Sequence, residues 1–158
     1  MQSDASNFKL ATQPVLPRTA VVVPMRNGFA QLATTGHVYW VPRRQVPAKR
    51  HDVILIYATR PTSAIVGEAR IKEVVTMYLD DLWRHTGDGS QLKESEFYAY
   101  FKGLEEGRAL KLEAPYAYQH PVPLSTLGKP RKSFRYWYVD ILGLPGDVPT
   151  RAGWGVKI

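Results

Sequence analysis

Short apolar runs divided by turn residues are the main pattern along this chain. The β-branched run TAVVVPM at residues 19–25 predicts a buried strand, and Pro24 marks its end or an edge position. The nearly continuous run DVILIYAT at residues 52–59 predicts a central strand covered on both faces. The longer run AIVGEARIKEVVTM at residues 64–77 predicts another strand, in which Gly67 forms a bulge or bend that helps to close a barrel.

The segment TTGHVYWVPRR, residues 34–44, lies between the first strand and the central one. A short helix is predicted just before it by NGFAQLATTG, with Asn27 as its cap and Gly36 at its end. Alternation then predicts a strand over residues 37–42, with both faces largely apolar. One face holds His37, Tyr39 and Val41, and the other holds Val38, Trp40 and Pro42.

Two more short helices are expected after the long strand. Apolar residues at helical spacing from residue 79 to residue 83 predict one helix, which Gly87 ends, and GDGS follows as a loop. Ser90 is the expected cap of the next helix, which stops at Gly103. That helix carries an aromatic stripe made of Phe97, Tyr100 and Phe101.

The alternating segments RALKLEAPYAY, residues 108–118, and SFRYWYVDIL, residues 133–142, predict the last strands, joined by a long proline-bearing connection. Five or six short strands with two or three small inserted helices predict an α+β fold built on a small mixed β-barrel. A chain of 158 residues matches one domain. We place this domain at residues 19–140, between a loose tail at residues 1–18 and an extension at residues 141–158.

Composition removes several kinds of chemistry. The chain has no cysteine, so it has neither disulfides nor thiolate metal sites. It also lacks a phosphate-binding glycine motif, a G-x-S-x-G elbow and an H-E-x-x-H pair. Its histidines are scattered without metal-ligand spacing; they are His37, His51, His85 and His120. We therefore predict no cofactor and no metal.

Hydropathy predicts where the protein works. No apolar run approaches the roughly 18–20 residues of a spanning helix. The first residues, MQSDASNFKLATQP, lack the basic start and apolar stretch of a signal peptide. We expect a soluble, cytoplasmic protein with no membrane partner.

The net charge of +7 is unevenly distributed. Residues 26–60 hold six basic residues and one acidic residue, and residues 128–158 hold six basic and two acidic residues. Between them, residues 61–127 hold ten acidic and seven basic residues. If the two basic segments meet in space, they form a positive face that attracts nucleic acid. The alternative is a cationic surface without a partner.

Basic and aromatic residues occur together in two places. KPRKSFRYWYV holds four basic and four aromatic residues, and VYWVPRR repeats the combination. Arginine and lysine neutralise phosphates, and exposed rings stack on unpaired bases, although strands also favour aromatic residues for packing alone. The residues predicted to bind nucleic acid are Arg26, Trp40, Arg43, Arg44, Tyr57, Arg60, Arg131, Lys132 and Arg135.

The order of these segments resembles the ASCH domain of the PUA-like superfamily over about residues 19–140. The most specific parts are DVILIYATRPTSAIVGEARI and the helical insertion LDDLWRHTG…LKESEFYAYFKG, followed by GRALKLE…PVPLSTLG and KPRKSFRYW. The resemblance implies a small β-barrel with a cleft beside it. It also implies binding of RNA or a nucleotide, and some members of the family are hydrolases acting on RNA or modified nucleosides.

This chain departs from the motif G-x-K-x-x-E-x-R that is characteristic of the family. Gly36 and Arg43 match, but Val38 stands at the lysine position and Val41 at the glutamate position. Valine transfers no proton. The resemblance therefore implies an RNA- or nucleotide-binding module that is non-catalytic.

Two further hypotheses stay open. One is an RNA- or modified-nucleoside-directed hydrolase with relocated groups, drawn from Lys49, Asp52, Glu68 and Glu73. The other is a protein-interaction module in which the acidic middle of the chain meets a basic partner. The sequence identifies no catalytic residue and leaves the ligand, its base and the oligomeric state undetermined.

Overall fold

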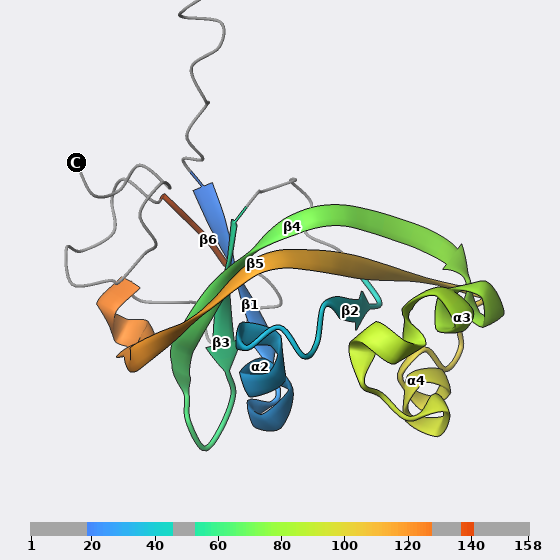
Figure 1. Ribbon diagram of the computed structural model, residues 1–158, viewed down its shortest axis with the longest axis horizontal. Coiled ribbons are helices and arrows are strands. Elements are labelled where there is room, and N and C mark those ends of the chain that lie inside the picture. The colour runs from blue at the N-terminus through green and yellow to red at the C-terminus, as the bar shows by residue number, and fades with distance from the viewer. Residues whose placement is uncertain (1–18, 46–52, 128–136, 141–158) are drawn as a thin grey trace, which may run out of the picture.

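The computed structural model describes residues 19–45, 53–127 and 137–140. These residues form one curved six-stranded sheet with three α-helices and a short 3-10 helix (Figure 1). The predicted α+β fold, a small mixed β-barrel with short inserted helices, is confirmed, and the sheet forms a half-barrel. The expected tail at residues 1–18 and the extension at residues 141–158 lie outside the described residues.

The first half of the sheet is built around a parallel pair. Strand β1 (Thr19–Met25) runs parallel to β3 (Val53–Ala58), and Ala20 pairs with Val53. Parallel neighbours need a crossover connection. It contains helix α2 (Asn27–Thr34) and strand β2 (Trp40–Arg43). Strand β3 is buried along nearly its whole length, as the apolar run predicts.

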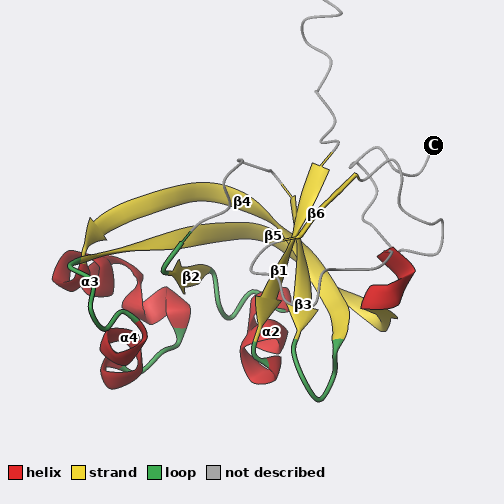
Figure 2. Cartoon of the chain, turned by 180° about the vertical axis from the view of Figure 1, so that it is seen from behind, coloured by secondary structure: helices red, strands yellow, loops and turns green. Residues whose placement is uncertain are grey.

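Two long antiparallel strands connect the barrel to a helical insertion (Figure 2). Strands β4 (Ala64–Tyr78) and β5 (Glu106–Pro123) arch away from the barrel, and helices α3 (Leu79–Ser90) and α4 (Glu94–Tyr100) lie at their far end. The pairing of β4 with β5 shifts register beside Gly67, which confirms the predicted bulge.

Short strands form the two edges of the sheet. Strand β2 pairs antiparallel with β5, and β6 (Trp137–Asp140) pairs antiparallel with β1. The strand order is therefore β2-β5-β4-β3-β1-β6. The 3-10 helix η1 (Leu124–Leu127) follows β5 directly. None of the helices among the described residues has the length and hydropathy to span a membrane.

Three groups of buried side chains hold these elements together. The barrel core fills the side of the sheet that α2 covers, and includes Val21, Val23, Ala30, Ala33, Ile54, Ile56 and Leu110. The outer cluster lies on the other face and includes Val22, Leu55, Ile65, Tyr118 and Val122. The insertion core joins α3 and α4 to β2 and β5 through Trp40, Leu82, Phe97, Phe101 and Ala109.

The predicted end of the first insertion helix is wrong. Helix α3 continues through Gly87 and the expected GDGS loop, and ends at Gln91 in the left-handed conformation with φ 60°. Its glycines serve close packing instead. A Cβ at Gly89 would lie 2.6 Å from Cδ1 of Trp40, so only glycine lets the helix approach β2 this closely.

The predicted caps are also wrong. Helix α2 begins after Arg26, and Asn27 instead accepts a 2.6 Å hydrogen bond from the Thr62 hydroxyl. Helix α4 begins after Lys93, whose backbone N–H donates to Glu96 Oε1 at 2.9 Å, so Ser90 is not its cap.

Two strand boundaries differ from expectation. Strand β2 begins only at Trp40, so residues 37–39 do not follow the predicted strand alternation. As a result, Val38 and Val41, which were predicted on opposite faces, both lie in the barrel core. Strand β5 continues to Pro123, through residues expected to form a connection. Its partner β4 is long enough to pair with those residues.

Candidate functional site

A cleft lies between the barrel and the helical insertion, in two adjoining compartments. The inner compartment has a volume of about 610 Å³ and apolar walls that include Met25, Phe29, Val41, Pro42 and Leu92. Its polar lining residues are Arg26, Arg43, Thr59, Glu96 and Tyr100. The outer compartment has a volume of about 980 Å³ and includes Arg44, Tyr78, Glu105, Glu106 and Arg108. Pro24, Arg43 and Tyr100 line both compartments.

Arg43 spans the opening of the half-barrel. It is the last residue of edge strand β2, and its Nη2 donates a 2.6 Å hydrogen bond to the carbonyl of Pro24 on β1. The described part of β6 pairs with β1 only as far as Val22. Nε of Arg43 is buried without a hydrogen-bond partner among the described residues. An unpaired buried donor costs about 1–3 kcal/mol, and such groups are uncommon outside functional or strained sites.

Arg44 joins the barrel to the insertion. Its Nη1 donates to the carbonyls of Tyr100 at 3.0 Å and Lys102 at 3.1 Å, at the C-terminal end of α4. A cation there also complements the partial negative charge of a helix C-terminus. The Arg44 backbone N–H donates to the Tyr100 hydroxyl, and Arg108 donates to the Arg44 carbonyl. We call these four hydrogen bonds the α4 latch.

Arg26 lines the inner compartment, and Arg60 follows Thr59, which also lines it. Arg26 immediately precedes α2, and Arg60 lies in the turn between β3 and β4. The Thr59 N–H donates to the Met25 carbonyl at 2.9 Å, which holds this turn against the start of α2. Both arginine side chains are exposed. Of the predicted arginines, Arg26 and Arg43 line the inner compartment, and Arg60 is adjacent in the chain to the lining residue Thr59.

The other predicted site residues are placed differently. Trp40 is only 4% exposed, and its ring packs against His85 and Lys111 inside the insertion core. Tyr57 is half-buried against the outer cluster. Neither ring lines the cleft. The predicted basic rim of Arg131, Lys132 and Arg135 lies outside the described residues.

Two cleft tyrosines were not identified from the sequence. Tyr78, at the end of β4, is 64% exposed, and Tyr100, at the end of α4, is 37% exposed. Both line the outer compartment. Tyr100 belongs to the predicted aromatic stripe, but helical spacing alone does not show that its hydroxyl reaches β2.

The residues proposed for a relocated hydrolase site do not come together among the described residues. Glu68 is fully buried and accepts a 2.6 Å hydrogen bond from the Tyr118 hydroxyl. Glu73 is exposed on β4, 4.0 Å from Lys111. Lys49 and Asp52 lie outside the described residues. The carboxylate that lines the inner compartment belongs to Glu96 on α4, which the sequence analysis does not propose as a site residue.

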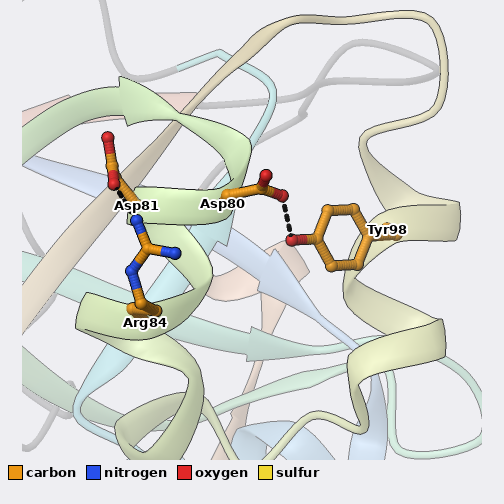
Figure 3. Close-up of polar contacts among 4 residues, drawn as sticks. All are labelled: Asp80, Asp81, Arg84 and Tyr98. Atoms are coloured by element: carbon orange, nitrogen blue, oxygen red, sulfur yellow. Dashed lines mark hydrogen bonds and ion pairs between the residues drawn. The ribbon is translucent and has the colours of Figure 1, made fainter.

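Polar contacts fix the insertion helices relative to one another (Figure 3). The Tyr98 hydroxyl of α4 donates to Asp80 of α3 at 2.5 Å, and Arg84 pairs with Asp81 along α3. The hydrogen bond to Asp80, together with desolvation and the negative charge of Asp80, raises the pKa of Tyr98 to about 12. The wall of the cleft that α4 provides is therefore held from two sides, by Asp80 and by the α4 latch.

Among residues 19–45, 53–127 and 137–140, no group of three or more histidine, aspartate or glutamate side chains is arranged to hold a metal ion. The chemistry of the described cleft comes from guanidinium groups, phenols, one threonine, one glutamine and three carboxylates.

Comparison with solved structures identifies the architecture. The crystal structure of ASCH from Zymomonas mobilis matches with a TM-score of 0.69 and 26% identity, covering 76% of this chain and 87% of that chain. A variant of the same protein, with a serine replaced by alanine, matches with a TM-score of 0.70 over 79% of this chain and 91% of that chain. The curved sheet with its helical insertion is therefore the fold of these proteins.

Sequence comparison agrees. An ASCH domain-containing ribonuclease of Zymomonas mobilis is 29% identical over 119 residues, which are 75% of this chain and 80% of the relative. A large ribosomal subunit protein uL22 of Ureaplasma parvum is 31% identical over 85 residues, 52% of this chain. The chain spans 27% of the length of that relative. No family model matches. In fold and in sequence, the chain is similar to ASCH domain proteins.

Proposed function

We propose that this protein binds single-stranded RNA by taking one unpaired nucleotide into the cleft. The observation that carries this proposal is the inner compartment, which has apolar walls and two arginines among its lining residues, Arg26 and Arg43. A base fits against Met25, Phe29 and Leu92, and Arg26, Arg43 and Arg60 neutralise the phosphates on either side. The ribonuclease name of the Zymomonas mobilis relative supports RNA as the ligand.

The phosphate path in this proposal avoids the acidic end of the cleft. Glu105 and Glu106 line the outer compartment and repel a polyanion. The Arg44 side chain already donates hydrogen bonds within the α4 latch, so we infer that it stabilises the fold and contributes less to phosphate binding. This assignment leaves Arg26 as the most informative position, because its side chain is exposed and lines the inner compartment.

Fluorescence anisotropy with labelled single-stranded RNA, at several salt concentrations, tests the proposal. Each phosphate contact contributes about 0.7 to the slope of log affinity against log salt for a single strand. Arg26→Ala is expected to weaken binding and to lower that slope by about 0.7. Arg84→Ala removes the same charge from α3, outside both compartments, and is the matched control. Equal slopes for the wild type and Arg26→Ala would remove Arg26 from the interface.

We further propose that binding occurs without cleavage. Val38 and Val41 stand where the family resemblance places a lysine and a glutamate, and both are 1% exposed. A hydrocarbon side chain has no proton to give or take, so neither residue replaces those groups in acid–base chemistry.

Ribonuclease activity is the second candidate, because a relative with that name covers most of this chain. It requires a base that accepts the proton of the ribose 2′-hydroxyl and an acid that protonates the departing 5′-oxygen. Glu96 and Tyr100 are ionisable groups in the inner compartment. Cleavage of labelled RNA that persists through purification and is lost in Glu96→Gln would favour the enzyme over the binding module.

A further inference from the structure

We propose that the inner compartment selects guanine, and that the carboxylate of Glu96 recognises it. This inference rests on the proposed function, because it concerns the base bound in the same compartment. Glu96 is the acidic side chain among the polar groups lining that compartment. Guanine presents two adjacent donors, N1–H and the 2-amino group, which match the two oxygens of a carboxylate.

The position of Glu96 is fixed by the helix that carries it. Glu96 is the third residue of α4, and its Oε1 accepts the backbone N–H of Lys93 at 2.9 Å in a capping box. This hydrogen bond orients the carboxylate before any ligand arrives. Each carboxylate oxygen accepts more than one hydrogen bond, so the cap leaves acceptor capacity facing the compartment.

The charges around Glu96 favour a neutral base with hydrogen-bond donors over an anion beside this carboxylate. The negative charge of Glu96 repels phosphate, whereas Arg26 and Arg43 attract it to another part of the same compartment. Uracil presents one N–H between two carbonyl oxygens, and those oxygens repel the oxygens of the carboxylate. Adenine and cytosine offer an amino group without an adjacent N–H. Guanine alone supplies a matched pair of donors.

Calorimetric titration of the full chain with the five nucleoside monophosphates GMP, IMP, AMP, CMP and UMP measures this selectivity. Recognition of a base by one pair of hydrogen bonds is worth about 1–3 kcal/mol, so we expect GMP to bind about 5- to 150-fold more tightly than UMP. IMP, which lacks the 2-amino group, is expected to fall between them.

Glu96→Gln separates recognition from folding, because glutamine also fills the third position of a capping box. We expect this variant to unfold like the wild type but to lose its preference for GMP over UMP. Glu94→Gln makes the same charge change in the first turn of α4, outside the lining residues, and should keep the preference.

The outcomes distinguish this inference from the proposed function. Binding of all five nucleotides with equal affinity would overturn guanine selection and leave nucleotide binding intact. An equal change for every nucleotide in Glu96→Gln would show that Glu96 acts only through its charge, which also overturns the inference. A wild type that binds neither these nucleotides nor single-stranded RNA would defeat the proposed function itself.

Discussion

Replacing Gly67 with alanine tests how the barrel is assembled. Gly67 lies at the bulge of β4, between helix α2 and strand β5. An added Cβ would lie 2.5 Å from Cγ2 of Thr34 and 2.5 Å from the carbonyl oxygen of Tyr116. Real Cβ atoms do not approach other heavy atoms this closely. The Tyr116 carbonyl belongs to the main chain, so it cannot rotate away as a flexible side chain can.

The expected destabilisation follows from these contacts. Forcing extra carbon into a packed interior costs about 1–3 kcal/mol, and the backbone contact places Gly67→Ala at the upper end of that range. For a chain of this length, each kcal/mol shifts the melting temperature by about 2–4 °C, so we expect a fall of roughly 6–12 °C. Urea denaturation followed by circular dichroism gives the free energy of unfolding directly.

Gly28→Ala is the matched control. Gly28 lies in the first turn of α2, and nothing lies within 4 Å of a Cβ added there. Alanine is a better helix former than glycine, so this variant should be unchanged or more stable by up to about 1 kcal/mol. If Gly67→Ala unfolds within about 0.5 kcal/mol of the wild type, the close approach of α2, β4 and β5 described above is incorrect.

Three further changes test the insertion and its attachment. Tyr98→Phe removes the hydrogen bond to Asp80 and should cost about 1 kcal/mol. The pKa of Tyr98 in the folded protein is raised to about 12 from its ordinary value of 10.0, so the stabilisation from this hydrogen bond is complete below pH 10 and should disappear as the pH rises through 12. Unfolding free energies of the wild type and Tyr98→Phe, measured against pH, would show this loss. Arg44→Ala removes the two side-chain hydrogen bonds of the α4 latch and should lower the free energy of unfolding by about 1–2 kcal/mol in urea denaturation. Arg84→Ala removes an exposed ion pair and should change the free energy of unfolding by close to zero in the same experiment. Phe97→Ala empties the centre of the insertion core and should cost about 3–5 kcal/mol by urea denaturation; a loss below 1 kcal/mol would mean that the insertion contributes little to folding.

The sequence predicts most of the strands because their apolar runs are continuous and short. The run at residues 53–58 is buried on both faces, as its composition requires, and the bulge falls at Gly67. The aromatic stripe on α4 is confirmed as part of the insertion core for Phe97 and Phe101. These features depend on local periodicity, which the sequence displays directly.

The errors arise where tertiary contacts override local signals. Gly87 and Gly89 resemble helix terminators, yet they lie within α3 because Trp83, Trp40 and Tyr39 occupy the space that a side chain would need. The sequence assigns Trp40 and the three residues before it to a regular strand, but Trp40 packs in the insertion core instead of facing the cleft. Burial of this kind depends on partners about 50 residues away in the chain.

The cleft itself was predictable only in part. The sequence identifies arginine as the important residue type, and two of the predicted arginines, Arg26 and Arg43, line the inner compartment. It does not identify Glu96, Tyr78 or Tyr100, because these residues join the cleft only through the packing of α4 and β4 against the barrel. Their local patterns are those of ordinary helix and strand residues.

Photochemical crosslinking of single-stranded RNA to the protein, followed by mass spectrometry of the crosslinked peptides, tests the proposed interface most directly. Tyr39 and Tyr116 are each 43% exposed and line neither compartment, so they report on non-specific contact. The account predicts crosslinks at Phe29 and Tyr100, and none above background at those two tyrosines. Crosslinks concentrated at Tyr39 or Tyr116, with Phe29 and Tyr100 unmodified, would contradict it.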